Sequence, residues 1–195
     1  AGWGLIGNAP LASASKILPN PTPPPPPRKK TNPPKKKRKK TKYDLMVILS
    51  GPEPQRTFLE EKLMRELQSY TGTVIFIKGV VEELQTSHSE NHITYYNFMN
   101  SEQLETAFNQ SKAVLCRSGY TTVMDLAQLG KKAFFIPTPG QYEQVYLAKK
   151  YKADGIAPSC KQENFSLDKI NKIALYRGLQ NFTTTISWTE LFRLF

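Results

Sequence analysis

The sequence has few cysteines and histidines, two of each among 195 residues, and no long apolar run. Two cysteines, Cys116 and Cys160, cannot build the disulfide framework of a small secreted protein. Neither they nor His88 and His92 have the spacing of a metal site, so we expect no metal and no cofactor. No segment approaches the roughly 20 apolar residues of a membrane-spanning helix. We therefore expect a cytoplasmic protein, with peripheral contact to the inner face of the membrane as an open alternative.

Acidic residues are absent from residues 1–42. This segment carries 11 of the 27 basic residues and 10 of the 15 prolines, whereas the rest of the chain carries 16 basic and 16 acidic residues. The run Pro23–Pro27 favours an extended polyproline II conformation, and the lysine-rich run after it repels itself. We predict a disordered tail over 1–42 that binds polyanions non-specifically. The neutral body is not expected to present the basic face of a nucleic-acid-binding domain.

Residues 43–180 alternate between short apolar runs, typical of strands, and amphipathic runs, typical of helices. Strands are predicted at 43–49, 73–77, 93–96, 113–116, 132–136 and 155–157. Helices are predicted at 55–69, 101–110, 120–129, 143–151 and 166–175, with Ser101 capping the second and an irregular segment at 80–91. The alternation predicts a Rossmann-like, doubly wound parallel α/β sheet over 43–180. An extension over 181–195 would follow, with one short helix near 189–194.

Three polar loops follow predicted strands, at the edge of the sheet where doubly wound folds bind their ligands. The first begins with Ser50 and Gly51, small residues that let a ligand approach the backbone at a helix start. Pro52 and Pro54 remove two backbone donors from this loop. Taken alone, an ordinary strand-to-helix turn is therefore the stronger reading of it.

The second loop runs from Arg117 to the start of the next helix. Ser118 can cap that helix, Gly119 permits close approach of a ligand, and Thr122 places a hydroxyl group on the first turn. A diphosphate here would meet backbone N–H groups and the positive end of the helix dipole. Arg117 would add positive charge or would pair structurally with an acid. Asp125 could accept hydrogen bonds from ribose hydroxyls, with a solvated helix acid as the alternative.

The third loop contains two prolines and Gly140 and leads into a cluster of one acid and two amides, Gln141, Glu143 and Gln144. These side chains can hydrogen-bond the hydroxyl groups of a sugar. The alternative for Glu143 is an acid that stabilises the helix dipole. Because all three loops follow strands of one parallel sheet, they should open on the same edge and form one site.

One pattern in the chain consists of a strand, RSG, a threonine, an acid, a glycine, a second apolar strand, P-x-P and a late glutamine. In this pattern the chain resembles the C-terminal domain of glycosyltransferase family 28. The resemblance covers about 43–175 and is strongest over 113–148. The family is known for the transfer of N-acetylglucosamine from UDP during lipid II formation, so the resemblance implies a role in cell-envelope glycan synthesis. The stretch SGPEPQRT at Ser50–Thr57 resembles an uncharacterised bacterial group of predicted glycosyltransferases.

This resemblance implies a GT-B fold, of which the chain would be the half that binds a UDP-sugar without a metal. The candidate contacts are the diphosphate for Ser50, Gly51, Arg117, Ser118, Gly119 and Thr122, the uracil for Phe98, Met99 and Asn100, the ribose for Asp125, and the sugar for Gln141, Glu143 and Gln144. The catalytic residue would lie on the acceptor-binding domain, for which residues 1–42 are too short.

We therefore expect a hexosyltransferase half that is inactive without a partner chain or a missing acceptor domain. One eukaryotic family member divides the same architecture over two chains. Two alternatives stay open from the sequence: a non-catalytic sugar-nucleotide-binding module, and a polyanion-binding or nuclear protein led by PPKKKRKK at 33–40.

Overall fold

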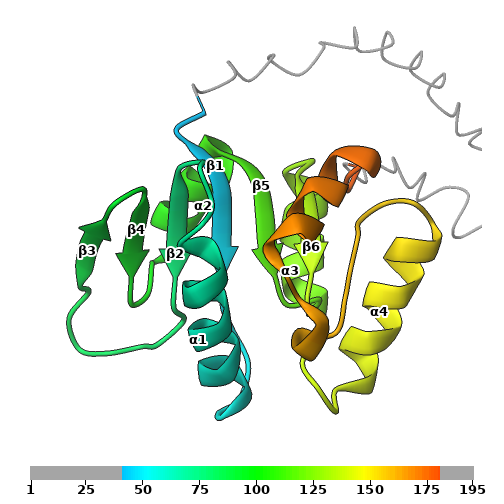
Figure 1. Cartoon of the computed structure of the whole chain (residues 1–195), viewed down its shortest axis with the longest axis horizontal. Coiled ribbons are helices and arrows are strands. Elements are labelled where there is room, and N and C mark those ends of the chain that lie inside the picture. Colours follow the sequence, from blue (N-terminus) through cyan, green and yellow to red (C-terminus); the bar gives the residue numbers. More distant parts are fainter. Residues whose placement is uncertain (1–40, 181–195) are drawn as a thin grey trace, which may run out of the picture. The chain divides into compact units, whose positions relative to one another are not determined.

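Six strands form one sheet in a computed structural model of the protein, which describes residues 41–180 (Figure 1). The strand order is β3-β4-β2-β1-β5-β6. In chain order the strands are β1 (Tyr43–Ile48), β2 (Val74–Ile77), β3 (Ser87–Glu90), β4 (Ile93–Tyr96), β5 (Ser111–Cys116) and β6 (Lys132–Phe135). Five of the six run parallel, and β3 pairs antiparallel with β4 at one edge.

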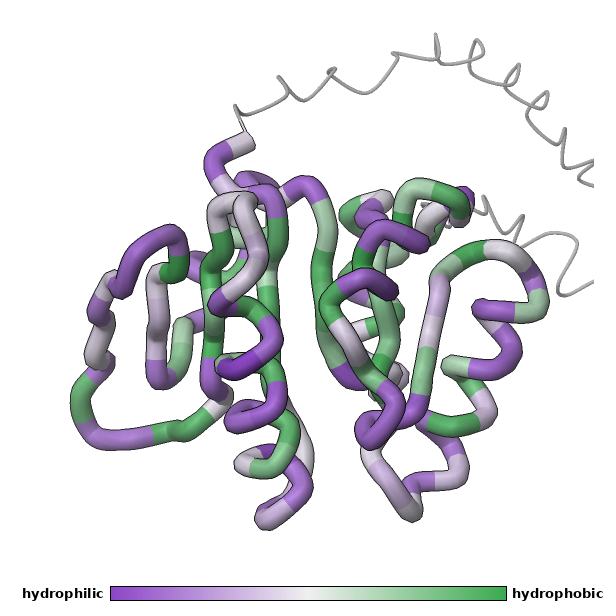
Figure 2. The backbone as a smooth tube through the Cα atoms, in the orientation of Figure 1, coloured by the Kyte–Doolittle hydropathy of each residue, from purple (hydrophilic) through white to green (hydrophobic). Residues whose placement is uncertain are grey.

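The central strand β1 explains the sheet's position in the core. Leu45, Met46 and Val47 are fully buried, as expected for a parallel strand covered on both faces. Their side chains alternate, so Leu45 and Val47 face one core cluster and Met46 faces the other. Figure 2 shows the apolar residues concentrated in these central strands.

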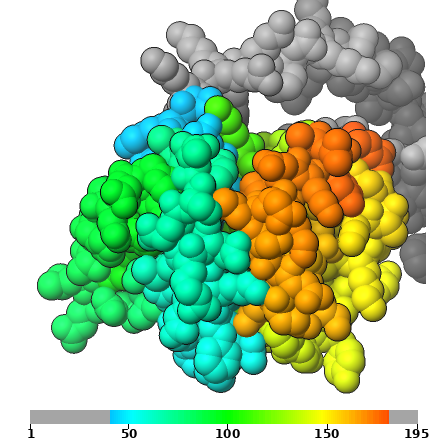
Figure 3. Space-filling model, in the orientation of Figure 1, coloured from blue at the N-terminus to red at the C-terminus, as the bar shows by residue number. Residues whose placement is uncertain are grey.

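Helices cover both faces of the sheet. They are α1 (Gln55–Leu67), α2 (Ser101–Gln110), α3 (Tyr120–Gln128) and α4 (Tyr142–Ala153), with 3₁₀ helices η1 (Gln162–Asn164) and η2 (Leu167–Leu175). On one face, Leu59, Leu63 and Leu67 of α1 pack with Ile170 and Ile173 of η2. Figure 3 shows α1 and η2 side by side over this face. The helices α2, α3 and α4 bury their apolar residues against the other face.

The structure confirms the Rossmann-like α/β fold and most of the predicted elements, but three local predictions are wrong. Residues 87–90 form the edge strand β3, although 80–91 was expected to be irregular. Asn100, not Ser101, caps α2, because its side chain accepts from Gln103 N–H in a capping box. Residues 155–157 form no strand, and a single bridge joins Phe135 to Ser159 instead. The last predicted helix, over 166–175, is present as the 3₁₀ helix η2.

Within residues 41–180, no helix is long and apolar enough to cross a bilayer. The tail predicted over 1–42 lies almost entirely outside the described residues, and so do the extension over 181–195 and its short helix near 189–194. The domain boundaries at 42/43 and 180/181 therefore stay predictions.

Candidate functional site

Five parallel strands end in register at one edge of the sheet. Ile48 of β1 lies beside Ile77 of β2 and Cys116 of β5, and the register continues to Tyr96 of β4 and Phe135 of β6. The loops that follow these strands, which include all three polar loops, are therefore neighbours. This is the edge at which open parallel sheets bind ligands.

Gly79 brings the loops after β1 and β2 into close contact. Its φ angle is +71°, and a Cβ atom at this position would lie 2.2 Å from the carbonyl oxygen of Leu49. Only glycine fits this space without moving the backbone. Val80 N–H donates to the Asn97 carbonyl at 3.0 Å, so the loop after β4 is joined to the same layer.

Gly51 links the first loop to the third. It has a φ angle of +108°, and a Cβ atom there would lie 3.5 Å from Oγ1 of Thr138. The Thr138 side chain is buried, and its hydroxyl group has no hydrogen-bond partner within residues 41–180. The N-terminus of the helix after Gly51 already has an anionic partner, because Glu53 accepts from Thr57 N–H at 3.2 Å and from its hydroxyl at 2.7 Å. This carboxylate makes α1 a weaker anion site than a bare helix start.

Ser118 joins the second loop to the third. Its buried hydroxyl group donates to the carbonyl oxygen of Gln144 at 2.7 Å. The prediction that Ser118 caps α3 is therefore wrong, and Gly119 occupies the N-cap position without a side-chain hydrogen bond. An added Cβ atom at Gly119 would meet no atom within 4 Å, so the space in front of this helix start is open.

The helix starts differ in how their backbone N–H groups are satisfied. The N-cap residues of α3 and α4, Gly119 and Gln141, give no side-chain hydrogen bond, whereas α2 has a complete capping box from Asn100. The first N–H groups of a helix have no partner within the helix. The starts of α3 and α4 can therefore receive an anion. Thr122 lies half-buried in the first turn of α3, and Asp125 is exposed one turn later.

Arg117 is buried and takes a structural role. Its guanidinium group donates to the carbonyl oxygens of Ile136 and Pro137, each at 3.2 Å, and of Gln55 at 2.9 Å. Its Nε has no hydrogen-bond partner in the part of the chain that the structure describes, and burial lowers the pKa of the group to about 10. The predicted contact between Arg117 and the diphosphate is inconsistent with this inward placement. The Arg117 side chain pairs with backbone carbonyl groups and not with an acidic side chain, which was the structural alternative.

The amide side chains of the third loop hold each other. Gln144 Oε1 accepts from Thr138 N–H at 2.9 Å, and its Nε2 donates to Oε1 of Gln141. These bonds fix the loop, while Glu143 stays exposed in the first turn of α4. The structure thus places the three predicted sugar-contacting residues together at one helix start.

The segment expected beside the uracil is held by Asn97, a residue that the sequence reasoning missed. Asn97 Oδ1 accepts from Thr86 and Phe98 N–H groups, at 2.8 and 2.9 Å, and Nδ2 donates to the Leu84 carbonyl at 2.8 Å. The adjacent Met99 packs against the core. An asparagine directly after an apolar strand was the available signal, because its side chain can bond nearby backbone.

Known proteins share sequence similarity with this domain. Residues 54–181 match the "Glycosyltransferase family 28 C-terminal domain". A Haemophilus influenzae (strain PittEE) UDP-N-acetylglucosamine–N-acetylmuramyl-(pentapeptide) pyrophosphoryl-undecaprenol N-acetylglucosamine transferase is 32% identical over 109 residues, which are 54% of this chain and 29% of the relative. The enzyme of the same name from Pasteurella multocida (strain Pm70) is 34% identical over 95 residues, 48% of this chain and 26% of its own. The chain thus spans less than a third of these relatives.

Solved structures support the fold alone, because their sequence identity is low. The ALG13 solution structure matches with a TM-score of 0.52 and 13% identity, covering 77% of this chain and 94% of ALG13. The glycosyltransferase SnogD from Streptomyces nogalater matches with a TM-score of 0.51 and 10% identity, covering 67% of this chain and 34% of SnogD. The family match covers well over half of the sequence, and the chain belongs to the C-terminal domain family of glycosyltransferase family 28.

Proposed function

We propose that this chain is the donor-binding half of a GT-B hexosyltransferase and that it binds a UDP-sugar, UDP-N-acetylglucosamine or a close relative. The observation that carries the proposal is the bond between Ser118 and Gln144. It joins the loop expected at the diphosphate to the loop expected at the sugar. Two helix starts without side-chain caps therefore lie at one sheet edge, as the two halves of a nucleotide-sugar would require.

The diphosphate would lie over the start of α3. Gly119 leaves the space open, and the unpaired N–H groups of the first turn point toward it. These donors and the hydroxyl of Thr122 would stabilise the negative charge that develops on the diphosphate as it leaves the sugar. Ser50 and Gly51 would approach from the first loop with their backbone, because Glu53 occupies the start of α1.

The remaining parts of the donor would follow the sheet edge in both directions. Asp125 is exposed on α3 and would accept from the ribose hydroxyls. The uracil would lie over the loop after β4, with Phe98, Met99 and Asn100. Glu143 would bind sugar hydroxyls beside Gln141 and Gln144. These two amides are hydrogen-bonded to each other, and they would bind the sugar through their remaining donors and acceptors or by exchanging this bond.

Transfer needs an acceptor site, which the relatives' additional length would supply. The reaction would move the hexosyl group from the nucleoside diphosphate to an acceptor hydroxyl, with a separate chain or domain supplying the acceptor site and the base. The ALG13 chain matches over 94% of its length, so a solved chain of this fold exists with little beyond the same domain. The relatives' name specifies an undecaprenol-linked acceptor, which is why we also propose peripheral contact with the membrane.

A comparison of donors tests the sugar assignment. The full chain would be titrated with UDP-N-acetylglucosamine, UDP-glucose and UDP, and the same series would be repeated with Glu143→Ala. We expect the N-acetylglucosamine donor to bind more tightly than UDP, and the variant to lose this difference while it keeps its affinity for UDP. Equal affinity for all three ligands would contradict a sugar contact in the third loop.

A further inference from the structure

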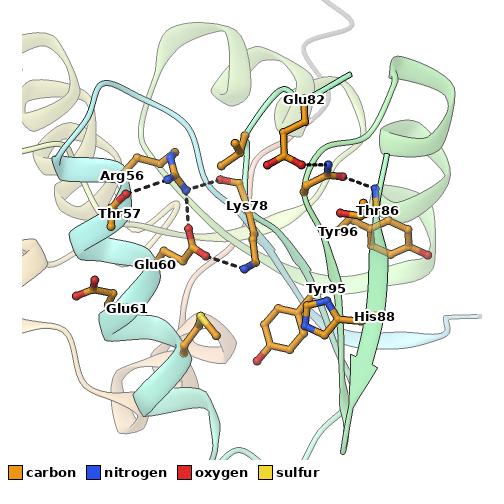
Figure 4. A pocket seen from close by; sticks show the side chains of 13 residues that line it. Arg56, Thr57, Glu60, Glu61, Lys78, Glu82, Thr86, His88, Tyr95 and Tyr96 are labelled. Atoms are coloured by element: carbon orange, nitrogen blue, oxygen red, sulfur yellow. Dashed lines mark hydrogen bonds and ion pairs between the residues drawn. The ribbon is translucent and has the colours of Figure 1, made fainter. Parts of the chain in front are cut away.

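A cleft of about 400 Å³ lies between α1 and the β3–β4 hairpin (Figure 4). The cleft lies on the face of the sheet that α1 covers, at the place where α1 does not cover β4 completely. None of the residues 117–119 or 137–144 lines this cleft, so it is separate from the start of α3 and from the sugar loop. It approaches the loops of the proposed donor site at the first turn of α1 and through the segments after β2 and β4.

A buried phenol hydroxyl without a partner forms part of the cleft wall. Tyr95 lines the cleft, its side chain is 1% exposed, and its Oη has no hydrogen-bond partner among the described residues. Burial raises the pKa of this phenol, and the charges of Glu90 and Glu60 add to the effect. The hydroxyl group therefore stays protonated and able to donate. A buried polar group without a partner costs stability, so the fold itself does not explain it.

The wall around Tyr95 is apolar on one side. The His88 ring stacks on the Tyr95 ring, with centroids 4.8 Å apart and an angle of 16° between the planes. Figure 4 shows the two rings together below Lys78. The Tyr95 ring is buried beneath His88, whose own ring is exposed, so the His88 ring is the flat surface that the C–H face of a sugar ring would contact.

Both basic side chains of the cleft pair with the same carboxylate, that of Glu60. Glu60 pairs with Arg56 at 2.6 Å and with Lys78 at 3.0 Å. Arg56 also donates to Glu53, to Thr57 and to the Lys78 carbonyl, so four of the five N–H groups of its guanidinium are used within the fold. Because Glu61 and Glu82 add negative charge, the lining is not suited to a phosphate.

We propose that this cleft is a second carbohydrate subsite, which takes one neutral hexose unit of a glycan. Tyr95 Oη and Lys78 Nζ would donate to sugar oxygens, Glu61 and Glu82 would accept from sugar hydroxyls, and the exposed ring of His88, stacked on Tyr95, would contact the ring face. The subsite is separate from the donor loops, and its ligand is an uncharged saccharide in place of a nucleotide.

The test is a titration of the full ¹⁵N-labelled chain with chitobiose, followed by amide chemical shifts. Inorganic phosphate and spermidine serve as probes for anions and cations, and saturating UDP serves as a competitor. We expect chitobiose to shift the amides around Lys78, His88 and Tyr95, with no displacement by UDP. Shifts from phosphate or spermidine alone, no shifts at all, or displacement of chitobiose by UDP would each overturn the proposal.

Tyr95→Phe makes the test specific to the hydroxyl group. Loss of one hydrogen bond to the ligand should weaken chitobiose binding about tenfold. The same substitution should leave the melting temperature unchanged or higher, because it removes no bond of the fold. The matched control is Tyr151→Phe, a phenol in α4 that packs on the opposite core cluster. Unchanged chitobiose affinity in Tyr95→Phe would overturn the assignment, whatever the outcome of the UDP titrations.

Discussion

The hydroxyl group of Ser118 donates a 2.7 Å hydrogen bond to the carbonyl oxygen of Gln144. This bond fixes the start of α4 against the loop that precedes α3. Two loops separated by about a helix and a strand of sequence thereby become one rigid surface. The proposed donor site depends on this surface, since the diphosphate and the sugar would each contact one of the two loops.

Ser118→Ala should therefore separate stability from ligand binding. The Gln144 carbonyl would keep its helical partner and lose only the Ser118 donor, at a cost of about 1 kcal/mol in the free energy of unfolding. The affinity for a UDP-sugar should fall more than the affinity for UDP, because α4 would no longer be held in place. The control is Ser159→Ala. The Ser159 hydroxyl donates to the Ala148 carbonyl, at 3.1 Å, and this bond lies outside the proposed site. The account is contradicted if both variants change UDP-sugar affinity equally.

Arg117→Met should be strongly destabilising. It removes a donor from three backbone carbonyl groups, those of Ile136 and Pro137 at the third loop and that of Gln55 at the start of α1. A buried carbonyl group without a partner costs about 1–3 kcal/mol. We expect a total loss of about 3 kcal/mol in the free energy of unfolding. Chemical denaturation measures it. If the variant instead stays stable and loses only UDP affinity, Arg117 contacts the ligand and our structural assignment is wrong.

Gly79→Ala should destabilise far more than an alanine at another glycine with a similar backbone. A Cβ atom at Gly79 would lie 2.2 Å from the Leu49 carbonyl oxygen, whereas at Gly130, with a φ angle of +60°, it would meet nothing within 4 Å. Gly130→Ala should cost about 1 kcal/mol from backbone strain alone. Thermal unfolding compares Gly130→Ala, which has backbone strain alone, with Gly79→Ala, which adds the overlap with Leu49. Equal losses of stability in the two variants would refute the close approach of these loops.

Asp44 should make stability depend on pH in the acid range. Its carboxylate accepts from Lys112 at 2.6 Å and from Thr73 N–H at 2.8 Å, and these bonds hold its pKa below the ordinary value of 3.8. Because the pKa is lower in the folded state, the stabilisation is complete above the unfolded value and is lost as pH falls through the folded value. Asp44→Asn should therefore flatten the fall of the melting temperature in acid. An unchanged acid profile would show that Asp44 contributes nothing there.

The sequence was sufficient for elements whose pattern is local. The leucines of α1 recur at intervals of four residues, and the apolar runs of β1, β2, β5 and β6 are buried as their composition predicts. The edge strand β3 has the sequence SHSE and every residue exposed, so it carries no apolar pattern. It forms because β4 offers an unpaired edge, which only the tertiary structure reveals.

The candidate site was predictable as a set of loops but not as a set of contacts. Their position after parallel strands follows from the alternation of elements. The roles of Arg117 and Ser118 do not, because both side chains turn to bonds with residues at least 19 positions away. Arginine is usually exposed and serine often caps helices, and here burial within the tertiary structure overrides both tendencies.

The most direct test of the central claim is a calorimetric titration of the full chain with UDP, with UMP and ADP as comparisons. Gly119→Trp would fill the open space before α3, and Gly119→Ala controls for the loss of glycine, since neither substitution meets an atom of the fold near its Cβ. We predict saturable binding of UDP, stronger than that of UMP or ADP, which Gly119→Trp abolishes and Gly119→Ala largely keeps. Absence of UDP binding by the folded chain, or binding that the tryptophan leaves unchanged, would contradict a donor site at the start of α3.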